Sequence, residues 1–341
     1  MNTAVQNAAP LLEVRDLSVR LGSPDASFEV VHRVNFTVAD SQTLGLVGES
    51  GCGKSITMLA LMGLLGPNMT VSGSIKLRGV ELVGMSQRDL ARLRGNRIAM
   101  IFQDPMTSLN PVMTIGEQLA EAIAIHRRDL PRRARTEHAM EMLKLVAIPF
   151  PERRLKQYPH ELSGGMRQRV MIALAMANDP ELLIADEPTT ALDVTIQAQI
   201  IELLQRLQAE CNMGLVLISH DLGVVAEVAN EVAIMYAGRI CEKGTVQAVF
   251  DRPHHPYTDG LLASLPKIDQ VTDKLTVIPG SLPPLASRPK GCRFHPRCQY
   301  AQAICTTEEP SLRSIGGVSV ACHFAETMPA ATDTGQTGVV R

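Results

Sequence analysis

The residues best suited to chemistry form the stretch Gly48-Glu49-Ser50-Gly51-Cys52-Gly53-Lys54-Ser55. It follows a short apolar run at residues 44–47 and precedes apolar residues at helical spacing. The glycines allow backbone angles that turn successive N–H groups toward phosphate oxygens, and the next helix points its positive dipole end at the same place. Lys54 is expected to reach the β- and γ-phosphates, and the Ser55 hydroxyl to bind Mg²⁺. The stretch therefore predicts a nucleotide-binding P-loop.

Two adjacent carboxylates, Asp186 and Glu187, end a second apolar run at residues 182–185. A carboxylate at the end of a buried strand can bind Mg²⁺ through water without being buried and unpaired, which suits Asp186. The next side chain points elsewhere, so Glu187 is suited to act as general base on the attacking water. The alternative is an acidic turn after a core strand, which the P-loop upstream makes the weaker interpretation.

A third group, Ser163-Gly164-Gly165, precedes a helical run that contains Gln168. Ser163 fits the N-cap of that helix, which is the simpler interpretation. Paired glycines lower helix stability unless a ligand must come close, so a cap alone does not account for them. The exposed amides predict a second anion-binding helix terminus. One chain then carries two phosphate sites, which are not easily used on the same nucleotide.

A parallel sheet must position these groups. Apolar runs and alternation predict strands at 11–21, 30–38, 44–47, 72–77, 97–102, 182–186, 214–219, 231–236 and 239–242. The first two are expected to form an antiparallel sheet that leads to the P-loop strand. Helical spacing marks residues 114–125, 136–146, 166–177 and 197–210. Strands alternating with helices predict an α/β fold with a helix-covered parallel sheet.

Composition limits the possible functions. The net charge of −2 over 341 residues does not favour nucleic acid as a partner. The apolar runs are far shorter than the roughly twenty residues needed to span a bilayer, and the N-terminus lacks the pattern of a secretory signal. We expect a cytosolic chain that reaches a membrane only through a partner.

Taken in order, the motifs resemble those of ABC transporter ATPase subunits. The residues that carry the resemblance are Gly48–Ser55 as Walker A, Gln103 as the Q-loop, 162–168 as the signature, 184–186 as the end of Walker B, 191–193 as the D-loop with Asp193, and His220 as the H-loop. The resemblance covers residues 11–250 and implies an ABC-type P-loop core, an antiparallel β subdomain and a helical subdomain at about 106–177. It implies ATP and Mg²⁺ as ligands, with Ser55, Gln103 and Asp186 at the metal. It also implies that Glu187, His220 and Gln103 are catalytic, Gln103 sensing the membrane partner as well.

The resemblance also accounts for the two phosphate sites. In this family two subunits pair head to tail, so that Ser163, Gly164, Gly165 and Gln168 of one close over the ATP on the P-loop of the other. The family usually stacks an aromatic side chain on adenine near the end of the first strand. This chain has Leu21 there, and Phe28 is the candidate substitute.

Four segments of the sequence are similar to those of the ATP-binding subunits of oligopeptide and dipeptide permeases. These segments are 162–169, 191–195, 291–298 and the C-terminal extension at 251–324. Met166 resembles the D-type member of a D/F heterodimer. The resemblance implies a homologous ATPase partner, two integral membrane permease subunits and an extracytoplasmic solute-binding protein. The cargo stays open between peptides and another small solute such as nickel or glutathione.

Four of the seven cysteines, Cys292, Cys298, Cys305 and Cys322, lie close together near the C-terminus with the spacing C-x₅-C-x₆-C-x₁₆-C. Four thiolates suit either tetrahedral Zn²⁺ or an iron–sulfur cluster. Short zinc knuckles are absent from this spacing, and wider spacing lets the chain wrap a [4Fe–4S] core, which the permease resemblance also implies. Plain buried thiols are the third possibility. Cys52 fills a variable P-loop position, where no role is expected.

The predicted organisation is a disordered N-terminus at 1–10, an ATPase domain at 11–250, an irregular cysteine-containing extension at 251–325 and a disordered tail at 326–341. A soluble ABC ATPase acting on nucleic acid or ribosomes is the alternative from another class. Such proteins usually carry a second cassette or a long coiled coil between P-loop and signature, and this sequence contains neither. A plain P-loop kinase would leave residues 163–168 without a role.

Overall fold

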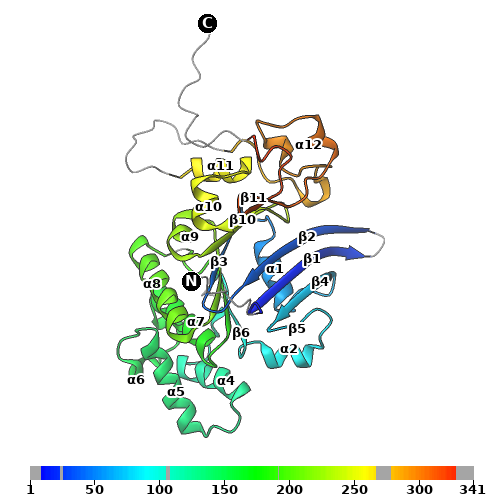
Figure 1. Ribbon diagram of the computed structural model, residues 1–341. Helices are drawn as coiled ribbons and strands as arrows, with labels where there is room; N and C mark the ends of the chain where they lie inside the picture. Colours follow the sequence, from blue (N-terminus) through cyan, green and yellow to red (C-terminus); the bar gives the residue numbers. More distant parts are fainter. Residues whose placement is uncertain (1–8, 24–25, 105–107, 191, 266–277, 328–341) are drawn as a thin grey trace, which may run out of the picture.

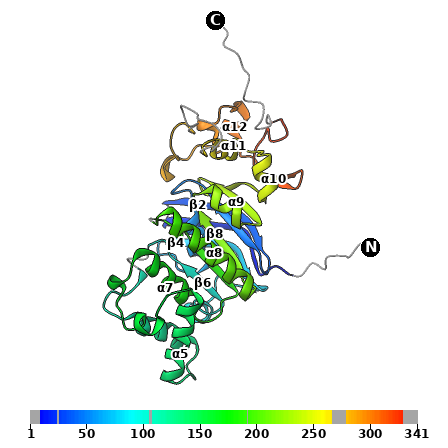
Figure 2. The ribbon, with the colours of Figure 1, turned by 90° about the vertical axis from the view of Figure 1, so that its left-hand side faces the viewer.

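Figure 1 presents the computed structural model of the chain, which describes residues 9–23, 26–104, 108–190, 192–265 and 278–327. Two sheets lie side by side, with a group of helices at one end and the C-terminal extension at the other (Figures 1 and 2). Among the described helices, none has the length and apolar character needed to cross a bilayer. The predictions for 1–10 and 326–341 fall mostly outside the described residues.

The main sheet has eight strands in the order β11-β12-β10-β9-β3-β8-β7-β6. Five of them run parallel to one another: β3 (Thr43–Val47), β6 (Ile98–Ile101), β7 (Leu182–Asp186), β8 (Gly214–Ser219) and β9 (Glu231–Tyr236). Strand β10 (Arg239–Thr245) turns back antiparallel on β9. The parallel strands are almost wholly buried because both faces of the sheet are covered, as their unbroken apolar runs predict.

Alternate residues of these strands enter two different cores. Leu183 and Leu217 face the helices, whereas Leu182 and Ile184 face the antiparallel sheet. The helical face is covered by α7 (Gly164–Met176), α8 (Val194–Cys211) and α9 (Leu222–Val228). The other face is covered by α1 (Lys54–Leu61) and the second sheet. The period-two pattern of a strand thus divides one apolar run between two layers.

The second sheet is antiparallel, as expected, and has the order β2-β1-β4-β5. Its strands are β1 (Leu12–Ser23), β2 (Ala26–Val38), β4 (Met69–Leu77) and β5 (Val80–Glu81), followed by helix α2 (Gln87–Leu93). Strands β1 and β2 place Leu21 directly opposite Phe28. Opposed residues of an antiparallel pair point to the same face, so the two candidates for adenine stacking lie next to each other.

The helical subdomain forms the end of the molecule farthest from the extension (Figure 2). It contains α4 (Ile115–His126), α5 (Arg132–Leu145), α6 (Pro151–Arg154), the short helix η1 (Pro159–Glu161) and α7. Helix α4 begins at a capping box, in which Thr114 and Glu117 bond each other's backbone amides. The helices expected at 114–125, 136–146 and 166–177 are confirmed.

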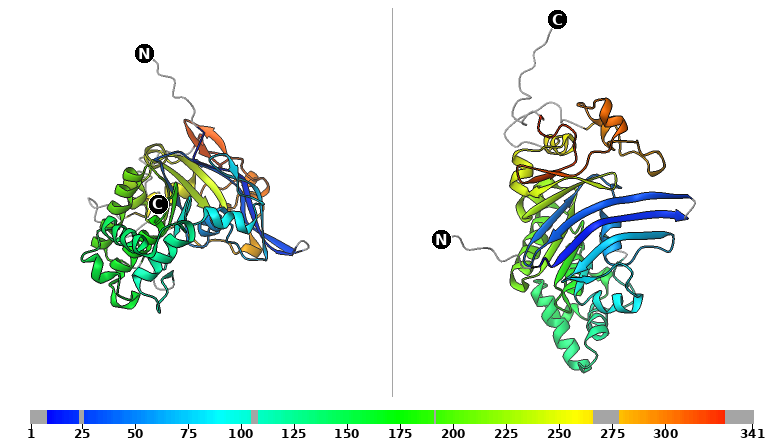
Figure 3. Two further views of the ribbon diagram at one scale, coloured as in Figure 1. Left: turned by 90° about the horizontal axis from the view of Figure 1, so that it is seen from below. Right: turned by 45° about the vertical axis from the view of Figure 1, so that its right-hand side comes forward.

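The extension is more regular than the sequence predicts. After α10 (Val246–Asp251), which ends where the extension begins, the chain forms α11 (Pro256–Ala263), η2 (Leu285–Ser287), η3 (His295–Arg297), α12 (Ala303–Thr307), β11 (Arg313–Ile315) and β12 (Val318–Val320). Strand β12 pairs with β10, so the hairpin β11–β12 continues the main sheet. The right-hand view of Figure 3 shows the extension lying over the end of the sheet opposite the helical subdomain. The main sheet therefore crosses the predicted boundary at residue 250.

Candidate active site

The predicted P-loop joins the buried strand β3 to helix α1. Gly48, Gly51 and Gly53 have φ values of 156°, 80° and 112°, in the region that favours glycine. At Gly48 a Cβ atom would lie 2.1 Å from the carbonyl oxygen of Met235, so only glycine fits beside β9. The backbone conformation of the loop thus accounts for the glycines that the sequence analysis singled out.

Lys54 is the first residue of α1 and is 5% exposed. Its ammonium donates to the carbonyl oxygens of Gly48 at 2.6 Å and Glu49 at 3.1 Å. Two neutral carbonyl groups therefore hold the Lys54 ammonium at the loop. An anionic phosphate binds an ammonium more strongly than a carbonyl does, so it can replace these acceptors. Ser50 is exposed and Cys52 is buried, and burial raises the pKa of the Cys52 thiol.

Asp186 ends β7 and is 5% exposed. Burial raises the pKa of its carboxyl, and a hydrogen bond from the Ser55 hydroxyl acts in the opposite direction. Its Oδ1 atom is buried without a hydrogen-bond partner in the part of the chain that the structure describes. A buried carboxylate with a free oxygen beside a hydroxyl is a donor set that suits Mg²⁺, so the two residues fit the predicted metal site.

Glu187 lies at the centre of the three predicted catalytic residues. Its Oε2 atom accepts from Gln103 Nε2 at 2.8 Å and lies 3.6 Å from His220 Nδ1. Its backbone has a φ of 48°, a conformation that costs free energy for a residue with a side chain. That turn separates the directions of Asp186 and Glu187, so that one carboxylate lies beside Ser55 and the other beside Gln103 and His220.

Thr190 also belongs to this group, although the sequence analysis missed it. Its hydroxyl donates to Glu187 Oε2 at 3.0 Å. In the sequence, Thr190 is marked out by its position three residues after Glu187. That spacing alone does not show that the turn brings the hydroxyl to the carboxylate. Tyr257 was missed for a stronger reason, because its hydroxyl accepts from the Glu49 amide although the two residues are 208 positions apart.

The predicted signature starts α7, and Ser163 is its N-cap, accepting from the Met166 amide at 3.4 Å. Ser163 and Gly164 are exposed, as a second phosphate site requires. A Cβ atom on Gly165 would lie 2.8 Å from Ile196, so close packing on α8 is a further reason for that glycine. Gln168 is 2% exposed, so in this conformation its side chain is not presented to a second molecule.

Asp193 is the N-cap of α8 and accepts from the Ile196 amide at 2.9 Å. It is exposed, and the next residue, Val194, is an apolar side chain with 83% of its surface exposed. Ala191, the first residue of the predicted D-loop, lies outside the described residues. The described part of this loop thus presents both a carboxylate and an apolar side chain to solvent.

The four C-terminal cysteines line one pocket, together with Phe294, Tyr300 and Phe324. Each of these aromatics follows a cysteine by two positions, and the Phe324 backbone amide donates to Cys322 Sγ at 3.4 Å. Burial raises the pKa of Cys292 to about 11. No group of three or more His, Cys, Asp or Glu side chains among the described residues has the arrangement of a metal-ion site.

Comparison with known proteins shows the family of the chain. A sequence profile described as "ABC transporter" matches residues 31–190, and one described as "Oligopeptide/dipeptide transporter, C-terminal region" matches residues 241–305. The oligopeptide transport ATP-binding protein OppD of Salmonella typhimurium is 50% identical over 307 residues, which cover 90% of this chain and 91% of OppD. The chain belongs to the ABC transporter ATP-binding subunits of the oligopeptide/dipeptide type.

Further similarities agree with this membership. The dipeptide transport ATP-binding protein DppD of Escherichia coli is 49% identical, and the match covers 92% of this chain and 96% of DppD. Among solved structures, the dimeric ABC cassette MJ0796 bound to ADP and Pi has a TM-score of 0.61 and 25% identity, covering 69% of this chain and 98% of MJ0796. The predicted ABC fold and ATPase class are therefore confirmed for this cassette.

Proposed function

We propose that this cassette is the ATP-hydrolysing subunit of a bacterial importer for di- or oligopeptides. The observation that carries the proposal is the meeting of Gln103, Glu187 and His220 beside the Asp186–Ser55 pair at one edge of the sheet. Peptide cargo is supported by the similarity to OppD and DppD, which are oligopeptide and dipeptide transport proteins, and by the match of residues 241–305 to the oligopeptide/dipeptide C-terminal region.

In the proposed reaction, Lys54 and the P-loop amides bind the phosphates, and Ser55, Asp186 and Gln103 hold Mg²⁺. The ion, when bound, neutralises charge that develops on the phosphate oxygens. Glu187 accepts a proton from the attacking water, and Gln103 and His220 orient the carboxylate and the terminal phosphate. Catalysis consists mainly of positioning and electrostatic stabilisation around an in-line attack.

The site of one chain is proposed to be completed by a second cassette. Helix α1 packs on β1 and β2, whereas α7 packs on α4, α5, α8 and β6, so the P-loop and Ser163 belong to different layers of the molecule. Ser163, Gly164 and Asp193 are exposed and free to contact a nucleotide bound by another subunit. We propose a head-to-tail pair with a homologous D/F-type partner, which binds two permease subunits at the cytoplasmic face of the membrane and works with an extracytoplasmic solute-binding protein.

This arrangement is tested by measuring ATP hydrolysis and association of the purified chain together. We expect specific activity to rise with protein concentration, and to rise further when the homologous partner is added. Sedimentation in the presence of ATP must show the corresponding dimer. Full activity of a chain that sediments as a monomer throughout turnover would overturn the composite site. Co-purification with integral membrane proteins separates the importer from a soluble ABC ATPase.

The cysteine pocket is proposed to hold a [4Fe–4S] cluster. Four thiols line one pocket, and one of them, Cys322, accepts a backbone amide from the residue two positions later, a kind of contact that stabilises cluster thiolates. Four sulfurs match the number of ligands of a [4Fe–4S] cluster, and the wide sequence spacing of the cysteines lets the chain wrap a core larger than Zn²⁺.

Anaerobic purification of the full chain tests the cluster. We expect brown protein with iron and acid-labile sulfide, and we expect Cys298→Ser to lose both. Cys211 is an exposed free cysteine on α8, so Cys211→Ser is the matched control and must keep the colour. Colourless wild-type protein that contains zinc would contradict the proposal.

A further inference from the structure

Glu49, the second residue of the P-loop, is held by the C-terminal extension through both its side chain and its backbone. The Arg297 guanidinium donates to Glu49 Oε2 at 2.9 Å. The Tyr257 hydroxyl accepts from the Glu49 amide at 2.9 Å. The Arg297 side chain is 7% exposed and Tyr257 is fully buried, so neither contact is a loose surface interaction.

The two contacting side chains are themselves fixed. Arg297 also donates to the Pro279 carbonyl at 2.8 Å, and its guanidinium lies 5.7 Å from the centre of the Tyr236 ring. Tyr236 meets Tyr257 edge to face, with ring centres 4.7 Å apart, and Phe294 packs on both rings. The aromatic cluster of Tyr236, Tyr257 and Phe294 therefore fixes the positions of the two groups that contact Glu49, the Tyr257 hydroxyl and the Arg297 guanidinium.

The contacts on Glu49 are linked to the group that binds phosphate. The Glu49 carbonyl accepts from Lys54 Nζ, so a shift of Glu49 displaces one of the two carbonyl groups, those of Gly48 and Glu49, that hold this ammonium. The Glu49 amide and the Gly48 carbonyl belong to one peptide plane, so the hydrogen bond to the Tyr257 hydroxyl also fixes the direction of that carbonyl. A chain of direct contacts therefore runs from Arg297 and Tyr257 to Lys54.

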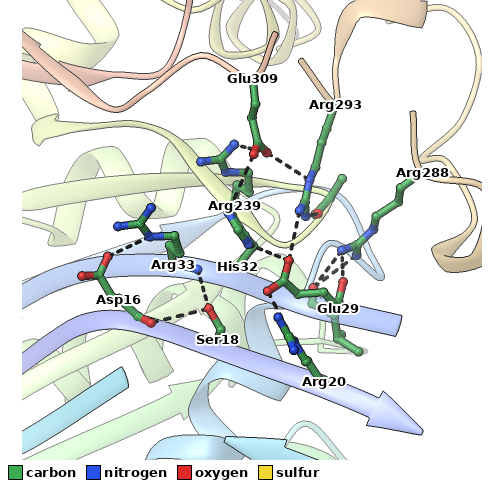
Figure 4. A network of polar contacts seen from close by, with 12 residues as sticks. Asp16, Ser18, Arg20, Glu29, His32, Arg33, Arg239, Arg288, Arg293 and Glu309 are labelled. Carbon is green, nitrogen blue, oxygen red and sulfur yellow. Dashed lines mark hydrogen bonds and ion pairs between the residues drawn. The ribbon is translucent and has the colours of Figure 1, made fainter. Parts of the chain in front are cut away.

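The Arg297–Glu49 pair is not needed to attach the extension. Figure 4 shows a separate polar network, in which Arg288, Arg293 and Glu309 of the extension contact Glu29 and His32 of β2. Strand β12 also pairs with β10. Since the extension is anchored in these other ways, the pair on Glu49 is available for a task at the nucleotide.

We propose that Arg297 and Tyr257 are positioning residues for the P-loop, and that the extension thereby sets the affinity of this chain for nucleotide phosphates. The inference rests on the proposed binding of ATP at Gly48–Ser55. The half-buried ion pair and the amide contact hold Glu49 in the conformation from which the Lys54 ammonium can move to the phosphates. Loss of either contact leaves the loop with more conformations to order when nucleotide binds.

The test measures the dissociation constant of ATP with Mg²⁺ by titration calorimetry on the full chain. We expect Arg297→Gln to weaken binding about 5- to 20-fold. Tyr257→Phe keeps the ring and removes only the acceptor, and we expect it to weaken binding about 3- to 10-fold. In the assembled ATPase the KM for ATP should rise, whereas kcat at saturating ATP changes little.

A double-mutant cycle identifies the partner. On a Glu49→Gln background, Arg297→Gln should have no further effect on the dissociation constant. Glu309→Gln is the matched control, because it breaks an ion pair that joins the extension to the core away from the P-loop, and it should stay within about twofold of wild type.

Two results would count against the proposal. Folded Arg297→Gln and Tyr257→Phe variants that both bind ATP like wild type overturn it, as does a Glu309→Gln variant that is weakened equally. If Arg297→Gln does not fold, Tyr257→Phe alone decides the question. Wild-type protein that fails to bind ATP would contradict the proposed function, whereas wild-type binding with unaffected variants overturns this inference alone.

Discussion

Gln103 Nε2 donates a hydrogen bond of 2.8 Å to Glu187 Oε2, which joins the segment after β6 to the end of β7. The two residues are 84 positions apart and meet because β6 and β7 are neighbouring parallel strands whose C-terminal ends share one edge of the sheet. A residue after β6 can therefore respond to the state of the carboxylate. Any movement of Gln103 must break or lengthen this bond.

Replacement of Glu187 by Gln tests the assignment of the general base. The amide keeps the shape of the side chain but does not accept the proton of water, so we expect hydrolysis to fall by roughly 10²–10⁴-fold while ATP binding is retained. Thr190→Val removes only a hydrogen bond to the same carboxylate and should have a much smaller effect. Near-normal turnover of Glu187→Gln would assign the base elsewhere.

Replacement of Asp186 by Asn tests the metal site through stability. Because burial raises the pKa of this carboxyl in the folded chain, the metal-free protein loses stability as pH rises through that pKa. The neutral amide removes this penalty, so we expect Asp186→Asn to unfold at a higher temperature than wild type at neutral pH without Mg²⁺. Added MgATP should raise the Tm of wild type much more than that of the variant. Equal stabilisation of both proteins would place Mg²⁺ elsewhere.

Replacement of Phe28 by Ala tests adenine stacking. Phe28 is 46% exposed and lies across from Leu21, on the face where the family's aromatic is expected. Stacking contributes on the order of 1 kcal/mol, so the variant should bind ATP about fivefold more weakly. Leu21→Ala is the control on the opposing strand. A larger loss in Leu21→Ala than in Phe28→Ala would assign the adenine contact to Leu21.

Replacement of Val194 by Lys tests the surface proposed to face the second cassette. This apolar side chain is 83% exposed at the start of α8, and a charge there would be buried without a partner when the subunits close. We expect ATP-driven association to weaken more than about tenfold while the monomer keeps its Tm. Val112 is similarly exposed at 79% but lies in the helical subdomain, so Val112→Lys should associate normally.

The parts of the fold that depend on local patterns were predictable from the sequence. Strands β7, β8 and β9 have the predicted bounds, and β3 begins one residue before its predicted start, because buried parallel strands appear as short apolar runs. The P-loop glycines and the Asp186–Glu187 pair were predictable for the same reason, since their chemistry lies in adjacent residues. Phe28 could be proposed only as a substitute, and its position opposite Leu21 required the strand register.

What depends on distant contacts was not predictable. The extension appeared irregular because its strands are only three residues long and are stabilised by pairing with β10, not by their own pattern. Tyr257 and Arg297 appeared to be ordinary residues of a proline-rich segment, since nothing local indicates that they contact Glu49. The burial of Gln168 was also missed, because helical spacing does not reveal which layer a helix faces.

The hairpin β11–β12 that continues the main sheet also limits how the chain can be divided. A fragment ending near residue 250 would remove β12 and leave one edge of β10 unpaired. It would also remove the Tyr257 ring from its buried position beside the P-loop. A chain shortened to its ATPase motifs would therefore keep the P-loop but lose the Tyr257 and Arg297 contacts that hold Glu49 in place.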